Sequence, residues 1–98
     1  MVMDDALIEV ALDLAERAFL HFEVNFERDK VGELETELIE EFWRAFVSNS
    51  FITLHISKRR GKNSHHIAEA IFKGVGRALR MALERDEGIP STKGAMKV

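Results

Sequence analysis

The chain has 98 residues, of which 46% are apolar and 32% charged, and its formal net charge is −3. This is the composition of an ordinary globular protein, and the weak negative charge excludes a general attraction to nucleic acid or to an anionic membrane. Because there is no Cys, disulfides and thiolate metal sites are excluded, and any metal must be held by His, Asp or Glu. We expect one domain over 1–98, with a core at 1–86 and a tail at 87–98.

A domain of this size buries only roughly 60 to 65% of the surface that its unfolded chain exposes, so a partner surface is expected. No apolar run approaches the roughly 20 residues of a membrane span, and "MVMDDALIEV" has neither the basic nor the apolar region of a signal peptide. We therefore expect a cytoplasmic protein with no nucleic-acid or membrane partner.

The first elements along the chain have the period of two that is typical of half-buried strands. Residues 6–15 alternate apolar and polar positions, and although this segment also fits a helix, "FLHFEVNF" at 19–26 repeats the alternation. The two segments are predicted to form a hairpin that turns at about 15–18.

Two helices and a third strand follow. Thr36 is predicted to cap a helix over 37–49, and "FITLHISK" at 51–58 alternates as a strand. Asn63 or Ser64 can cap a last helix that runs to about Arg85. Two helices on one face of a small, largely antiparallel sheet make a two-layer α+β sandwich.

The last helix begins "GKNSHHIAEAIFKG", which places two His residues in its first turn. His65 and Glu69 stand at i and i+4 and should meet on one face, whereas His66 is turned by about 100° from His65. Neither face of the helix offers a complete metal site, because such a site usually needs three protein ligands. A metal bound here would need further ligands from another segment or another chain, so we expect the site to lie at an interface. The alternative is that both His residues simply decorate an exposed helix start.

Other polar residues divide into a possible anion site and ordinary surface. Lys73 lies on nearly the same helix face as His65, and the tail residues Ser91, Thr92 and Lys93 form a donor-rich cluster that suits a phosphate. The strand and helix periodicities indicate ordinary roles for the remaining candidates. His21 and His55 are expected to be solvated, and Trp43 and the Phe residues are expected to belong to the core. Glu37, Glu40 and Glu41 are expected to form an acidic face that aids solubility.

The sequence resembles the C-terminal half of imidazoleglycerol-phosphate dehydratase, a manganese lyase of histidine biosynthesis. The resemblance covers nearly the whole chain. It rests on segments in a specific order: "ALIEVALDLAERAFLHFEV", "TELIEEFWRAF", "FITLHI", "GKNSHHIAEAIFK" and "IPSTKG".

The resemblance implies a βββαβα half-domain with a four-stranded sheet, like domain 2 of ribosomal protein S5, in a homo-oligomer that can be a large shell of cubic symmetry. It also implies two Mn²⁺ ions at chain interfaces and a small phosphorylated imidazole substrate. The roles that it implies are metal ligands for His65, His66 and Glu69, phosphate contacts for Lys73, Ser91 and Lys93, and a further substrate contact for Arg17.

The chain departs from the family pattern in two ways. Many members have a metal-binding His where this chain has Glu41, and we treat Glu41 as a hypothetical carboxylate ligand in its place. In addition, the chain corresponds to the second half alone, so the motifs of the first half are absent from it.

Three functions remain open. The first is a dehydratase-like lyase half that eliminates water from imidazole glycerol phosphate when another chain, such as a second copy, completes its site. The second is a self-assembling, metal-binding half-domain without catalytic activity, whether a fragment, an ancestral-type half or a designed one. The third is a split enzyme that needs a separate N-terminal half chain.

Overall fold

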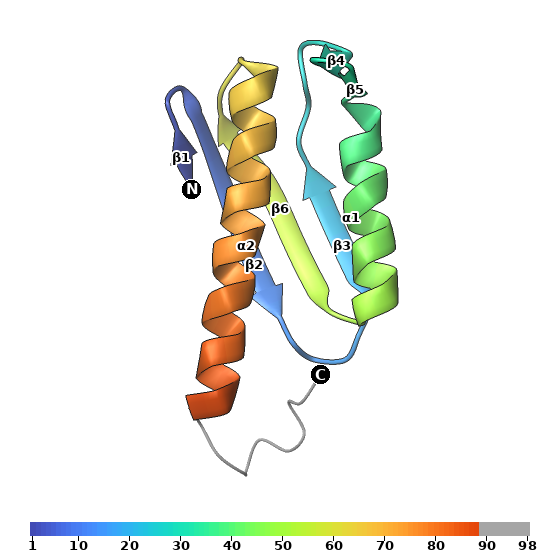
Figure 1. Ribbon diagram of the computed structural model, residues 1–98, viewed down its shortest axis with the longest axis vertical. Helices are drawn as coiled ribbons and strands as arrows, with labels where there is room; N and C mark the ends of the chain where they lie inside the picture. The colour runs from blue at the N-terminus through green and yellow to red at the C-terminus, as the bar shows by residue number, and fades with distance from the viewer. Residues whose placement is uncertain (89–98) are drawn as a thin grey trace.

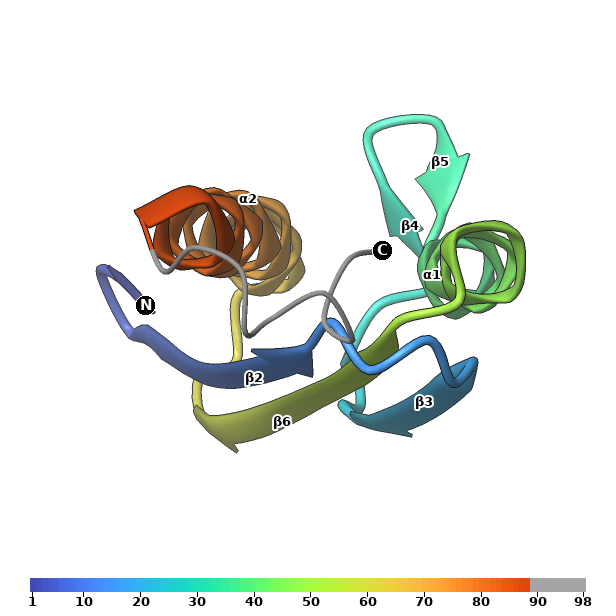
Figure 2. The same ribbon diagram turned by 90° about the horizontal axis from the view of Figure 1, so that it is seen from below.

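The computed structural model describes residues 1–88 of the chain. Four strands form a mixed sheet in the order β1-β2-β6-β3, and two helices lie on one face of it (Figures 1 and 2). The predicted two-layer α+β fold is confirmed. The elements are β1 Val2–Met3, β2 Ala6–Asp13, β3 Phe19–Glu23, β4 Lys30–Val31, β5 Leu34–Glu35, α1 Glu37–Ser50, β6 Thr53–Arg60 and α2 Ser64–Gly88.

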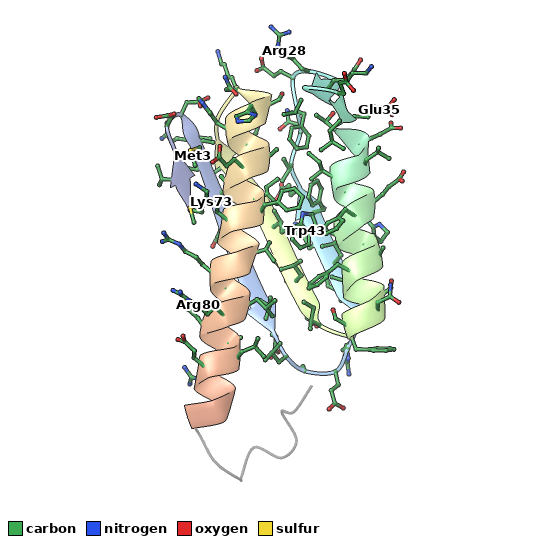
Figure 3. The ribbon with its side chains drawn as sticks, viewed as in Figure 1. Met3, Arg28, Glu35, Trp43, Lys73 and Arg80 are labelled. Carbon is green, nitrogen blue, oxygen red and sulfur yellow. The ribbon has the colours of Figure 1, made fainter. Side chains whose placement is uncertain are left out.

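The core lies between the sheet and the helices. Alternate strand residues point toward the helices, so that Ile8, Leu54 and Ile56 are fully buried, as the period of two predicts. The helices contribute residues at helical spacing, and Trp43 of α1 approaches Phe72 of α2 with ring centroids 5.0 Å apart in the space between the helices (Figure 3). The buried apolar residues of the helices are Ile39, Trp43, Val47, Ile67, Ala68, Ala70, Ile71 and Val75.

The predicted hairpin of the first two long strands is wrong. β6 lies between β2 and β3, antiparallel to β2 and parallel to β3. The alternation of residues determines the face to which each side chain points, but it does not determine which strand is the neighbour. Two strand spacings measure only about 10 Å, which the connection at residues 14–18 can span. β6 therefore occupies a central position, where its apolar side chains are fully buried.

The two helices begin differently. Thr36 occupies the N-cap position of α1, as predicted, but its hydroxyl makes no cap hydrogen bond and instead donates to the carbonyls of Arg28 and Asp29 at 3.0 and 3.2 Å. The cap of α2 is confirmed, since Asn63 Oδ1 accepts from the backbone N–H of His66 at 3.0 Å.

α2 continues to Gly88, three residues past the predicted end at Arg85, because Asp86 and Glu87 are compatible with a helix. The predicted tail contacts of Ser91, Thr92 and Lys93 lie outside the described residues. Within residues 1–88, no helix combines the length and the apolarity that crossing a membrane requires.

Candidate functional site

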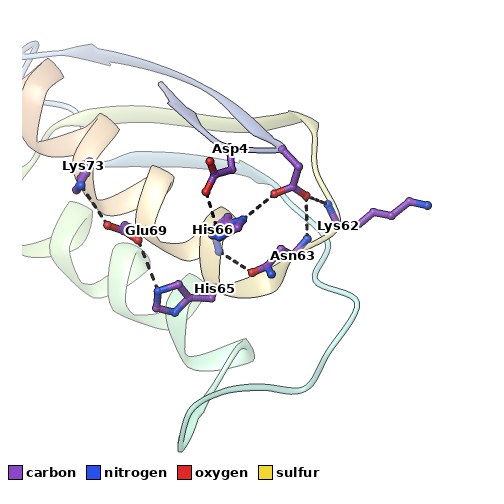
Figure 4. Close-up of polar contacts among 8 residues, drawn as sticks. Asp4, Lys62, Asn63, His65, His66, Glu69 and Lys73 are labelled. Carbon is purple, nitrogen blue, oxygen red and sulfur yellow. Dashed lines mark hydrogen bonds and ion pairs between the residues drawn. The ribbon is translucent and has the colours of Figure 1, made fainter.

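A row of three polar side chains runs along one side of α2 from its first turn. Glu69 lies between His65 and Lys73: its Oε1 is 3.5 Å from His65 Nε2 and its Oε2 is 3.1 Å from Lys73 Nζ (Figure 4). The three residues are four positions apart, so the helix itself brings them together. This arrangement agrees with the spacing read from the sequence.

His66 points in another direction, toward the turn between β1 and β2. This turn consists of Asp4 and Asp5, and Asp4 has a positive φ of 49°, which Asp tolerates better than most residues. Asp5 Oδ1 lies 2.8 Å from His66 Nδ1, and Asp4 Oδ2 lies 3.4 Å from His66 Nε2 (Figure 4). The first turn of α2 thus presents imidazole groups on two sides.

These contacts shift three pKa values. The hydrogen bond from Lys73 lowers the pKa of Glu69, and the hydrogen bond with Asp5 raises the pKa of His66. The pKa of Asp5 is strongly lowered, first by the backbone N–H of Lys62 and then by His66. Both carboxylates are therefore ionised at neutral pH, and the side chains of Asp5 and Glu69 place negative charge beside the two imidazoles.

The donor types fit a divalent metal such as Mn²⁺, which accepts imidazole nitrogen and carboxylate oxygen. However, the described part of the chain contains no cluster of three or more His, Cys, Asp or Glu residues that could hold one ion. The side chain of His65 is 68% exposed and that of Glu69 is 36% exposed, so both are accessible from outside the chain. One copy thus offers partial ligand sets.

Two other predicted site residues are not beside this row. Glu41 is exposed on α1, and no hydrogen bond or ion pair within residues 1–88 links it to the α2 row. Arg17 lies in the connection between β2 and β3, where its carbonyl accepts from Thr53 Oγ1 at 2.9 Å. Since Thr53 begins β6 and α2 follows the other end of β6, the length of this strand, about 23 Å at 3.3 Å per residue, separates Arg17 from the first turn of α2, where His65 and His66 lie (Figure 1).

Sequence reasoning missed several charged residues near the first turn of α2. Asp5 is one, because it is distant in sequence from the His residues that it approaches in space. A hollow of about 500 Å³ beside His65 is also lined by three cations, Arg28 and Lys62 from connections and Lys30 from β4. In the sequence these residues appear only as the acidic pair "DD", the charged segment "ERDK" and the Lys of "GKN". None of these segments has a distinctive spacing.

The chain is similar to a known protein family. The model of the imidazoleglycerol-phosphate dehydratase family matches residues 1–79. Curated imidazoleglycerol-phosphate dehydratases from Granulibacter bethesdensis and Clostridium botulinum are 55% and 56% identical to the chain; each alignment covers 96% of the chain and 50% and 49% of the respective relative.

Solved structures of the same family are also similar to the chain. A crystal structure of imidazoleglycerol-phosphate dehydratase from Staphylococcus aureus is 46% identical, with a TM-score of 0.82 over 84% of this chain and 48% of the other. The enzyme from Pyrococcus furiosus, in complex with (S)-C348, is 40% identical with a TM-score of 0.74 over 82% of this chain and 45% of the other. The chain thus spans about half the length of the curated relatives that it matches, and it belongs to the imidazoleglycerol-phosphate dehydratase family.

Proposed function

We propose that this chain supplies one half of a lyase site that eliminates water from imidazole glycerol phosphate, a step of histidine biosynthesis, and that another chain completes the site. The observation that carries the proposal is the start of α2, where His65 and Glu69, one turn apart, face one way and His66 faces another. Family membership and the half-length match support it.

In this proposal the α2 turn holds parts of two Mn²⁺ sites. His65 and Glu69 serve one ion, His66 serves the other, and Glu41 of another copy is a candidate ligand. When bound, Mn²⁺ would supply Lewis-acid stabilisation of the imidazole as an imidazolate, which would favour the elimination of water. The chain's own task is to hold the imidazole ring of the substrate between the side of α2 that carries His65 and the side that carries His66.

Cationic side chains are proposed to hold the phosphate group. Lys73 is already beside the α2 row, where its ammonium group contacts Glu69 at 3.1 Å. Arg17 and the tail residues Ser91, Thr92 and Lys93 are the further candidates. A phosphate prefers several such donors at once, because each charge-assisted hydrogen bond is stronger than a neutral one.

The positions of these residues are the reason why we propose assembly of several chains. Arg17 and the first turn of α2 lie at opposite ends of the sheet in one copy, so a site that uses Arg17 with His65 or His66 would combine residues of two chains. A symmetric homo-oligomer, up to a closed shell, provides such contacts repeatedly. A separate N-terminal half chain is the other possible source of the missing groups.

A second candidate function is a self-assembling half-domain that binds metal without catalysis. It is favoured by the partial ligand sets, since the described residues of one copy do not form a complete metal cluster.

One experiment separates these functions. Light scattering of the purified chain with and without Mn²⁺ measures assembly, and a dehydratase assay with imidazole glycerol phosphate is made on the same samples. Assembly with turnover that His66→Ala abolishes supports the lyase. Assembly without turnover supports the metal-binding half-domain if adding an N-terminal half chain restores nothing, and the split enzyme if it does. A monomer that is indifferent to Mn²⁺ contradicts all but the split enzyme.

A further inference from the structure

Asp5 connects three parts of the chain through one carboxylate. Its Oδ2 accepts from the backbone N–H groups of Lys62 and Asn63 at 2.8 and 3.1 Å, in the loop that leads into α2. Its Oδ1 lies 2.8 Å from Nδ1 of His66, in the first turn of the same helix (Figure 4). The carboxylate therefore holds both the helix start and the imidazole ring.

This geometry determines which nitrogen of His66 carries hydrogen. An ionised carboxylate only accepts hydrogen bonds, so the 2.8 Å contact requires hydrogen on Nδ1. In the neutral ring the lone pair is then on Nε2. A His residue that binds a metal through one nitrogen commonly donates the other N–H to a carboxylate, which selects the tautomer and orients the ring.

We propose that Asp5 is the positioning residue of His66: it selects the Nδ1–H tautomer and aims Nε2 outward as a ligand for a divalent metal. The inference rests on the proposed function, because it assumes that His66 is a ligand. Asp4, which lies 3.4 Å from Nε2, does not block this direction, because its side chain is 74% exposed and free to turn into solvent.

The test is Asp5→Asn, which keeps the size of the side chain. The amide oxygen of Asn can still accept from Lys62 and Asn63, while its NH₂ group faces His66 Nδ1 and requires a lone pair there. Long-range ¹H–¹⁵N NMR of the metal-free protein, at a pH where the ring is neutral, should show the Nδ1–H tautomer in the wild type and the Nε2–H tautomer in the variant. Mn²⁺ affinity, measured by titration calorimetry, should fall by about 10- to 100-fold.

Two variants control the experiment. Glu9→Gln removes the same charge from an exposed ion pair with Arg59 on the open sheet face, and it should leave both readouts unchanged. Asp5→Glu restores the carboxylate and should recover the Nδ1–H tautomer. Denaturant unfolding of each variant shows whether the fold is retained.

The outcomes separate this inference from the proposed function. The role of Asp5 is overturned if His66 of the wild type is in the Nε2–H form, and this outcome can be seen even if Asp5→Asn folds poorly. It is also overturned if a folded Asp5→Asn variant has the same tautomer as the wild type. Unchanged Mn²⁺ affinity in a folded variant with the switched tautomer also overturns it. If the wild type binds no Mn²⁺, the proposed function fails, while the spectra still show whether Asp5 selects the tautomer.

Discussion

The two ends of the sheet differ in how the chain is held together. At the end where α2 begins, separate segments are joined by side-chain hydrogen bonds of Asp5, Ser64 and Thr36. At the other end, the connection that contains Arg17 is held by a hydrogen bond from Thr53 and by the backbone contact of Phe19 with Ile52. The first end is organised within one copy, whereas Arg17 is exposed, and in the proposed function it acts together with the metal-binding residues of another chain.

The largest expected effect tests whether the site joins these two ends from different chains. Arg17→Ala and His66→Ala should each reduce dehydratase activity by about 100-fold or more, because each removes a group that binds substrate or metal. When the two variants are unfolded and refolded together in equal amounts, about a quarter of the sites should combine an intact Arg17 with an intact His66 from neighbouring chains. The assay should then recover about a quarter of wild-type activity.

The control is each variant refolded alone, which should gain nothing. A mixture with only the mean activity of the two variants contradicts a site shared between chains.

The next largest effect concerns β6, the strand that separates the two ends. Leu54 is fully buried, so Leu54→Ala should lower the free energy of unfolding by about 2 to 5 kcal/mol. His55, the next residue, points to the open face, and His55→Ala should change it by less than about 0.5 kcal/mol. Urea unfolding of both variants measures the difference, and equal effects would show that the two faces of β6 are not packed as described.

A smaller effect compares one residue type at the two ends. Asn63→Ala removes the cap of α2 and should cost about 1 kcal/mol. Asn49→Ala removes only an exposed contact with the carbonyl of Ala45 near the end of α1, and Ala is the better helix former, so this change should be close to neutral. Thermal unfolding of the two variants checks this order, and a larger loss for Asn49→Ala contradicts it.

The smallest expected effect is a pH dependence at the α2 end. Because Asp5 raises the pKa of His66 above 6.5, the stabilisation by their contact is fully present below pH 6.5 and is lost as pH rises through the folded-state pKa. The lowered pKa of Asp5 gives a contribution that is present above its unfolded pKa of about 3.9 and is lost as pH falls through the folded-state value.

The metal-free wild type should therefore lose stability relative to His66→Asn as pH rises above about 6.5. The effect is small because both side chains are partly exposed. Urea midpoints measured across this range provide the check, and His21→Asn, on the open sheet face, should follow the wild type. Parallel curves for the wild type and His66→Asn would contradict the expectation.

Much of the fold was predictable because it depends on local periodicity. The period of two identified β2, β3 and β6, and the period of 3.6 identified both helices and the row of His65, Glu69 and Lys73. The cap of α2 by Asn63 was also predictable, since it acts within one turn. The neighbours of β6 and the role of Thr36 were not, because they depend on contacts between distant segments.

The sequence by itself determined the faces of the strands, the direction of the α2 row and, through the motif around "SHHIAE", the family resemblance. Backbone geometry is the reason, because residues four apart on a helix or two apart on a strand lie on one side in any fold. Only the tertiary structure decided that Asp5 meets His66, 61 residues away, and that Arg17 lies at the far end. Such contacts follow from the path of the chain across the sheet, which places β6 at the centre to bury its apolar side chains.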